Sequence, residues 1–153
     1  MTGFSTDSGS ITISNIERFE VVSPTTGALR SLTLDGTSGI DNFDTTNDVA
    51  QFVRIFANAG DDVVVAGNNG RHTIYAGAGE DIVTAGDGGS IIEGSTGADI
   101  LTGGSGIDTL SYLNESADVS INLATNTASG GEATGDIISV SYTHLTLPTI
   151  LLV

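Results

Sequence analysis

Aspartates that follow glycine-rich turns recur through the middle of the chain, and their side chains are the clearest candidates for chemistry. Asp62, Asp81 and Asp99 each stand two residues after a glycine and two residues before an aliphatic residue. Carboxylate and main-chain carbonyl oxygens are the ligands that Ca²⁺ takes in proteins. These positions are therefore candidate cation ligands. The alternative is that each carboxylate only makes a local hydrogen bond to the main chain of its own turn.

The charge balance of the chain limits the partners it can have. The 153 residues include 19 Asp and Glu against four Lys and Arg, all of them arginine, for a net charge of −15. Such a chain lacks the basic groups that neutralise phosphates, so nucleic acid and acidic membrane surfaces are disfavoured as partners. Compact packing of so many carboxylates favours bound cations, and an acidic surface that only aids solubility is the alternative.

Composition also restricts the fold and the compartment. Cysteine is absent, so disulfides and thiolate metal sites are unavailable, and an extracellular chain then needs another staple such as calcium. The 21 glycines and two prolines indicate repeated tight turns, and the 5 % of aromatic residues favours a thin aliphatic core. We find no N-terminal signal peptide and no 18-residue apolar run. We therefore expect one domain, or one module of a longer array, without a membrane span.

A nine-residue repeat organises residues 57–112. Its pattern is x-G-x-G-x-D-x-U-x, where U is a large aliphatic residue, and one extra residue stands at Asn68–Asn69. The six units are Ala57–Val65, Ala66–Tyr75, Ala76–Thr84, Ala85–Glu93, Gly94–Thr102 and Gly103–Ser111. Six small turns, each followed by a short strand, predict an all-β fold. This fold is a parallel β-roll, a right-handed β-solenoid of about six nonapeptide repeats with irregular β flanks and inward-pointing U residues.

This pattern resembles the hemolysin-type calcium-binding repeat of the RTX family, whose consensus is GGxGxDxUx. The likeness is strong over residues 57–112 and weaker through residues 113–139. In that family the Asp carboxylate and carbonyls of the glycine turn hold calcium. The resemblance therefore implies the following candidate ligands: Asn58, Gly60, Asp62, Gly77, Gly79, Asp81, Ser95, Gly97, Asp99 and Asp108.

Two nonapeptides complete one coil of such a roll, so successive turns alternate between two edges. One edge receives Asp62, Asp81 and Asp99, and the opposite edge receives His72, Ser90 and Asp108. We predict calcium between the Asp62 and Asp81 loops and between the Asp81 and Asp99 loops. For Asp108 a local turn bond is an equal alternative, His72 is expected to be a degenerate turn residue, and the second edge is expected to be mostly free of metal.

The flanks carry weaker signals. Residues 1–56 are expected to form a β-rich flank, with one or two strands in Ile11–Val22. We expect a turn in Leu34–Phe43, where Asp41 is out of phase with the array, and a further metal site there is the alternative. Residues 113–139 are expected to cap the roll, with Tyr112 and Leu113 plugging its core. Residues 140–153, which begin VSYTHLTLPT, resemble translated sequencing-adapter sequence and contain no glycine, acid, Lys or Arg. We expect this tail to be an artefact, and a genuine apolar strand or export signal is the alternative.

Catalytic patterns are missing from the sequence. It has no G-x-S-x-G motif, no lysine for a phosphate-binding loop, and one histidine, His72, before the tail. We therefore expect a structural calcium-binding module of a secreted or cell-surface repeat protein, adhesin-like or toxin-like, exported by a type I system and joined to neighbouring modules. One alternative is the C-terminal appendage of a secreted hydrolase, a metalloprotease or lipase. Another is a metal-free solenoid that binds a partner.

Overall fold

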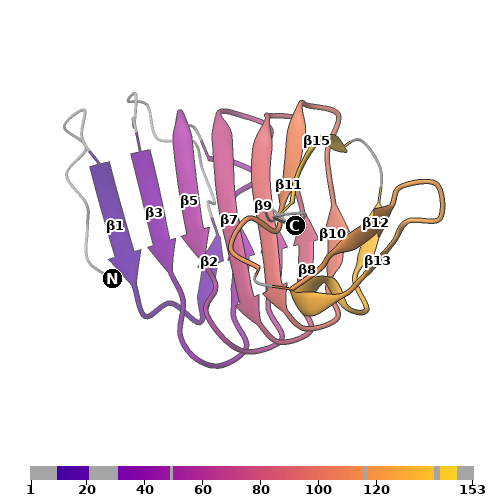
Figure 1. Ribbon diagram of the computed structural model, residues 1–153. Coiled ribbons are helices and arrows are strands. Elements are labelled where there is room, and N and C mark those ends of the chain that lie inside the picture. Colours follow the sequence, from indigo (N-terminus) through magenta and orange to yellow (C-terminus); the bar gives the residue numbers. More distant parts are fainter. Residues whose placement is uncertain (1–9, 21–30, 49, 116, 140–141, 148–153) are drawn as a thin grey trace.

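Two parallel sheets facing each other make up the fold in the computed structural model, which describes residues 10–20, 31–48, 50–115, 117–139 and 142–147. The first sheet has seven described strands, side by side in Figure 1 in the order β1 (Ser10–Ser14), β3 (Ser31–Asp35), β5 (Phe52–Phe56), β7 (Arg71–Ala78), β9 (Ser90–Thr96), β11 (Asp108–Ser111) and β15 (Tyr142–Thr146). From β1 to β11 consecutive strands along the chain alternate between the sheets, which is the topology of a β-roll.

The second sheet has eight described strands. Their order is β12 (Ser120–Asn122), β13 (Thr127–Ser129), β14 (Ile137–Ser139), β10 (Ile100–Thr102), β8 (Ile82–Thr84), β6 (Val63–Val65), β4 (Asn42–Asp44) and β2 (Arg18–Glu20). The six neighbouring strands β14, β10, β8, β6, β4 and β2 pair in parallel. Strands β12 and β13 form an antiparallel hairpin at the end of the roll (Figure 1). A short 3₁₀ helix, η1 (Gly131–Ala133), precedes β14.

One aliphatic side chain per repeat fills the space between the sheets, as the sequence predicts. The six U residues are fully buried: Val64, Ile74, Val83, Ile92, Leu101 and Leu110. Their neighbours Ile82, Ile91 and Ile100 point outward and are 44 %, 46 % and 39 % exposed. Because side chains alternate across a strand, a single inward residue per short strand is what a thin two-sheet core requires.

The roll begins before the repeats. Strands β3, β4 and β5 lie in the same two sheets as the repeats, and Leu34, Phe43 and Ile55 extend the core through residues 31–56. The prediction of strands in Ile11–Val22 is confirmed by β1 and β2, within the described residues. The turn predicted in Leu34–Phe43 lies at residues 36–41, between β3 and β4, and β4 pairs with β6.

The far end of the roll differs from its expected form in one side chain. Tyr112 is buried in the core, as predicted, but Leu113 is 56 % exposed. The predicted plug therefore consists of Tyr112 without Leu113. In the tail, Tyr142–Thr146 forms β15 beside β11, with an irregular register at Asp108–Thr109. Backbone pairing does not depend on the origin of the residues that pair, so the assignment of this tail to adapter sequence stays a prediction.

Candidate metal centre

Asp62, Asp81 and Asp99 are aligned along one edge of the roll, in the turns that lead from the first sheet to the second. The main-chain N–H of Asp62 donates to Oδ1 of Asp81 (2.8 Å), and that of Asp81 donates to Oδ1 of Asp99 (2.9 Å). Each carboxylate therefore reaches back to the preceding loop. We call this row the carboxylate ladder.

The carboxylate ladder is longer than the sequence indicated. At its start the N–H of Asp41 donates to Oδ1 of Asp62 (2.7 Å), and at its end the N–H of Asp99 donates to Oδ1 of Asp136 (3.0 Å). Asp41 is therefore in phase in space, which corrects the earlier prediction. Asp136 was missed, although DIIS at residues 136–139 repeats the DILT of residues 99–102.

The second carboxylate oxygen is what distinguishes the three central rungs. Oδ2 of Asp62, Asp81 and Asp99 is buried and has no hydrogen-bond partner among the described residues. The three residues are only 0–1 % exposed. A buried charged oxygen without a partner is costly, because neither water nor a donor replaces its lost hydration.

The pKa values of these three carboxyl groups are raised for the same reason. Burial, together with the repulsion of neighbouring carboxylates, raises the pKa of Asp62 to about 6 and that of Asp99 to about 7, although a main-chain N–H donor to each lowers it in part. Burial also raises the pKa of Asp81, with Asp61 adding to the effect. The metal-free loops therefore disfavour the charged form of the groups that a cation would stabilise.

The loops of these three rungs share an unusual main-chain conformation. The second and fourth positions of each unit have φ values between 71° and 145°: Asn58, Gly60, Gly77, Gly79, Ser95 and Gly97. At the fourth position only glycine fits, since a Cβ on Gly79 would lie 2.1 Å from the carbonyl oxygen of Gly60. The repeated conformation stacks each loop tightly on the one before.

Part of the chain matches a known family of repeats. Residues 50–70, 64–92 and 75–110 match the RTX calcium-binding nonapeptide repeat, in four copies. This segment belongs to the RTX repeats. This count differs from the six units read from the sequence. No curated protein and no solved structure matches the chain.

Calcium, which the RTX repeats bind, fits the first edge of the roll. The Oδ2 atoms of Asp62, Asp81 and Asp99 have no donor among the described residues, and a divalent cation beside them would supply the positive charge that balances them. Among the described residues, no three His, Cys, Asp or Glu side chains gather around one point. A calcium ion held here would take main-chain carbonyl oxygens of the loops in addition to single carboxylates.

The second edge of the RTX roll is built differently, as its sequence suggested. His72 is buried, and its Nε2 lies 3.2 Å from Oδ2 of Asp48. The N–H of Ser90 donates to Oδ1 of Asp108 (2.8 Å). Gly86 and Gly104, at the second positions of their units, lie outside the left-handed region that the first edge uses. An imidazole and a hydroxyl thus replace two carboxylates on this edge.

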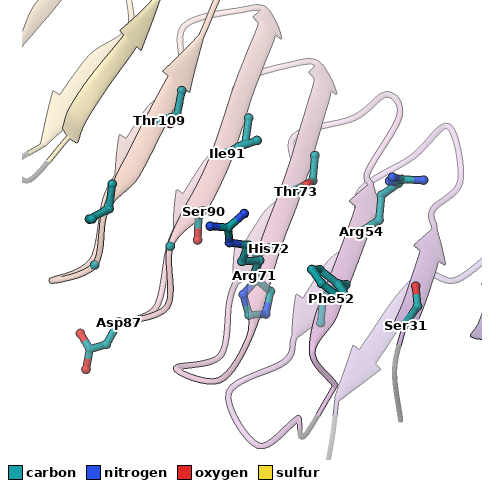
Figure 2. A pocket seen from close by; sticks show the side chains of 14 residues that line it. Ser31, Phe52, Arg54, Arg71, His72, Thr73, Asp87, Ser90, Ile91 and Thr109 are labelled. Atoms are coloured by element: carbon teal, nitrogen blue, oxygen red, sulfur yellow. The ribbon is translucent and has the colours of Figure 1, made fainter. Parts of the chain in front are cut away.

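A surface hollow lies beside the second edge. Figure 2 shows it over β5, β7 and β9, and the residues that line it include Phe52, Arg54, Arg71 and Ile91. None of the three central aspartates lines this hollow. The candidate metal centre therefore lies in the loops of the opposite edge.

Proposed function

We propose that the chain is a structural module whose roll folds on binding calcium between the Asp62 and Asp81 loops and between the Asp81 and Asp99 loops. One observation carries the proposal: three buried carboxylate oxygens in a row have no hydrogen-bond donor in the part of the chain that the structure describes. The loop residues Asn58, Gly60, Gly77, Gly79, Ser95 and Gly97 supply main-chain carbonyls in this proposal. Asp108, on the other edge, is at most a weaker ligand.

Electrostatic repulsion explains why the ion matters for folding. Neighbouring rungs of a sheet are about 4.8 Å apart, and two bare carboxylates at that spacing repel by about 3 kcal/mol at an effective dielectric near 20. A cation shared by adjacent loops turns this repulsion into attraction. The chain's residues hold the carboxylates in place through the N–H to Oδ1 bonds, and the cation supplies the missing charge.

The wider setting follows from the family. RTX repeats typically belong to secreted proteins, and we propose that this module is part of a secreted or surface protein of the adhesin or toxin kind, exported by a type I system. In the part of the chain that the structure describes, no helix is long and apolar enough to cross a membrane. An attached hydrolase domain, a metalloprotease or lipase, is the second candidate, and a coding sequence with HExxH or GxSxG upstream would favour it.

Calcium titration tests the proposed function. We expect the chain to show little β-structure by far-UV circular dichroism in chelator and to gain it cooperatively as calcium is added, because the ion offsets the buried charge. Magnesium at the same concentration is the control, since it prefers octahedral sites with bound water and fits carbonyl-lined loops poorly. A spectrum that is fully β in chelator and unchanged by calcium would instead support a metal-free solenoid.

A further inference from the structure

The five rungs of the carboxylate ladder differ in what faces the Oδ2 atom. At Asp41, the first rung, the N–H of Thr37 donates to Oδ2 (2.7 Å) and the Thr37 hydroxyl donates to Oδ1 (3.0 Å). At the central rungs Asp62, Asp81 and Asp99, Oδ2 has no donor among the described residues. The first carboxylate is therefore satisfied by its own loop, and the central three are not.

The last rung is satisfied in another way. The hydroxyl of Tyr112 donates to Oδ2 of Asp136 at 2.5 Å, and both side chains are buried. Tyr112 follows the sixth unit directly, so it stands at the first position of the next one, where the central rungs have Ala57, Ala76 and Gly94. That position faces Oδ2, because a Cβ on Gly94 would lie 2.4 Å from Oδ2 of Asp99.

The backbone at the second position explains why the first rung differs from the central ones. Thr37 occupies this position in the unit Gly36–Asp44 and lies outside the left-handed region. The corresponding residues of the central rungs, Asn58, Gly77 and Ser95, have φ values of 80°, 108° and 71°. Changing the sign of φ redirects the N–H, so only Thr37 is placed to donate to the carboxylate of its own loop.

We propose that Thr37 and Tyr112 close the two ends of the calcium array, by supplying hydrogen-bond donors where the central loops take a cation. Asp41 then continues the ladder as the main-chain donor to Asp62, and Asp136 continues it as the acceptor from the N–H of Asp99, but neither holds calcium. This inference rests on the proposed function. It confines the ions to the three central loops and leaves no unpaired carboxylate oxygen at either end of the ladder.

Counting bound calcium in the whole chain by equilibrium dialysis tests the closure. We expect Asp41→Asn and Asp136→Asn to bind as many ions as the wild type, and Asp81→Asn to bind fewer. Loss of an ion from Asp41→Asn or Asp136→Asn would overturn the closure while leaving the proposed function intact. A wild-type chain that binds no calcium would instead overturn the proposed function.

Opening the first rung is the complementary experiment. Thr37→Gly removes the hydroxyl bond and permits a positive φ, so we expect it to bind one calcium ion more than the wild type. Thr37→Ala is the matched control: it also loses the hydroxyl but still disfavours positive φ, and its ion count should not change. An unchanged count for a folded Thr37→Gly variant would contradict the role of the second position.

The tyrosine closure has its own variant. Tyr112→Phe removes only the donor to Asp136, so we expect a lower melting temperature in calcium and the wild-type ion count. An unchanged melting temperature for Tyr112→Phe would show that the hydroxyl does not close the ladder.

Discussion

Asp81 is the residue on which the two proposed sites depend together. It lies between Asp62 and Asp99 in the carboxylate ladder, donating its N–H to one neighbour and accepting from the other. Asp108 lies on the opposite edge, where Ser90 and not a carboxylate is its neighbour. The two aspartates occupy the same place in the repeat, so they form a matched pair for mutation.

Asp81→Ala should therefore weaken calcium-induced folding much more than Asp108→Ala. Each site filled at tenfold over its dissociation constant contributes about 1.4 kcal/mol, and Asp81→Ala damages two. The measurement is the calcium dependence of the far-UV signal for both variants, with bound ions counted in parallel. Equal effects of the two substitutions would contradict the assignment of the metal to one edge.

The raised pKa values predict how stability depends on pH. The folded, metal-free roll binds protons at Asp62 and Asp99 more tightly than the unfolded chain, since burial raises these pKa values from 3.8 to about 6 and about 7. The stability that protonation gives is fully present below about pH 4 and is lost as the pH rises through 6 to 7. In chelator, the melting temperature should fall over this window, until little folded protein remains at pH 7.

Calcium should abolish much of this fall of the melting temperature with rising pH, because it stabilises the charged carboxylates. Thermal melts between pH 4 and pH 7, with chelator and with calcium, provide the test. Asp62→Asn combined with Asp99→Asn is the control, and its profile in chelator should be flatter. A chelated protein that is more stable at pH 7 than at pH 4 would show that these groups do not govern folding.

At the scale of the elements, the turns of the first edge carry strain that glycine relieves. Ser95 has a φ of 71°, a region that costs an L-residue about 1–2 kcal/mol, whereas Gly77 occupies the same place in the preceding rung without that penalty. Ser95→Gly should raise the melting temperature of the calcium-bound roll and Ser95→Val should lower it, as measured by thermal denaturation. The opposite order would show that position two does not need the left-handed conformation.

The sequence predicted the elements of the repeats well, because each unit carries its own turn glycine and inward aliphatic residue. The alignment of Asp62, Asp81 and Asp99 follows from the nine-residue period, with two units to a coil and one extra residue between Asp62 and Asp81. The outer rungs were harder to predict from the same period. Asp41 lies 21 residues before Asp62 and Asp136 lies 37 residues after Asp99, so a fixed spacing excludes both.

Backbone pairing, and not sequence separation, decides which residues join the ladder. Extra residues between β4 and β6 are absorbed by the loop before β5 and by longer strands, so Asn42 still pairs with Val63. Likewise the segment between Tyr112 and Asp136 forms a hairpin and a 3₁₀ helix before β14 returns to pair with β10. The donors Thr37 and Tyr112 depend on this register, so single-sequence reasoning could not assign them.

At the scale of the whole molecule, the roll is a stack of nearly identical rungs with a net charge of −15. Each rung contacts mainly its neighbours (Figure 1), so its stability is approximately a sum of rung and interface terms. The repulsion between successive carboxylates adds along the first edge unless cations offset it. A calcium-dependent module of this kind would stay unfolded where calcium is scarce and fold where it is abundant.

A crystal structure of the chain grown in calcium, with anomalous scattering to locate the ions, tests this account most directly. The account predicts anomalous peaks between the Asp62 and Asp81 loops and between the Asp81 and Asp99 loops, near the Oδ2 atoms of these three residues, and none at Asp41 or Asp136. Ordered central loops without peaks, or with protein donors on those three Oδ2 atoms, would contradict it.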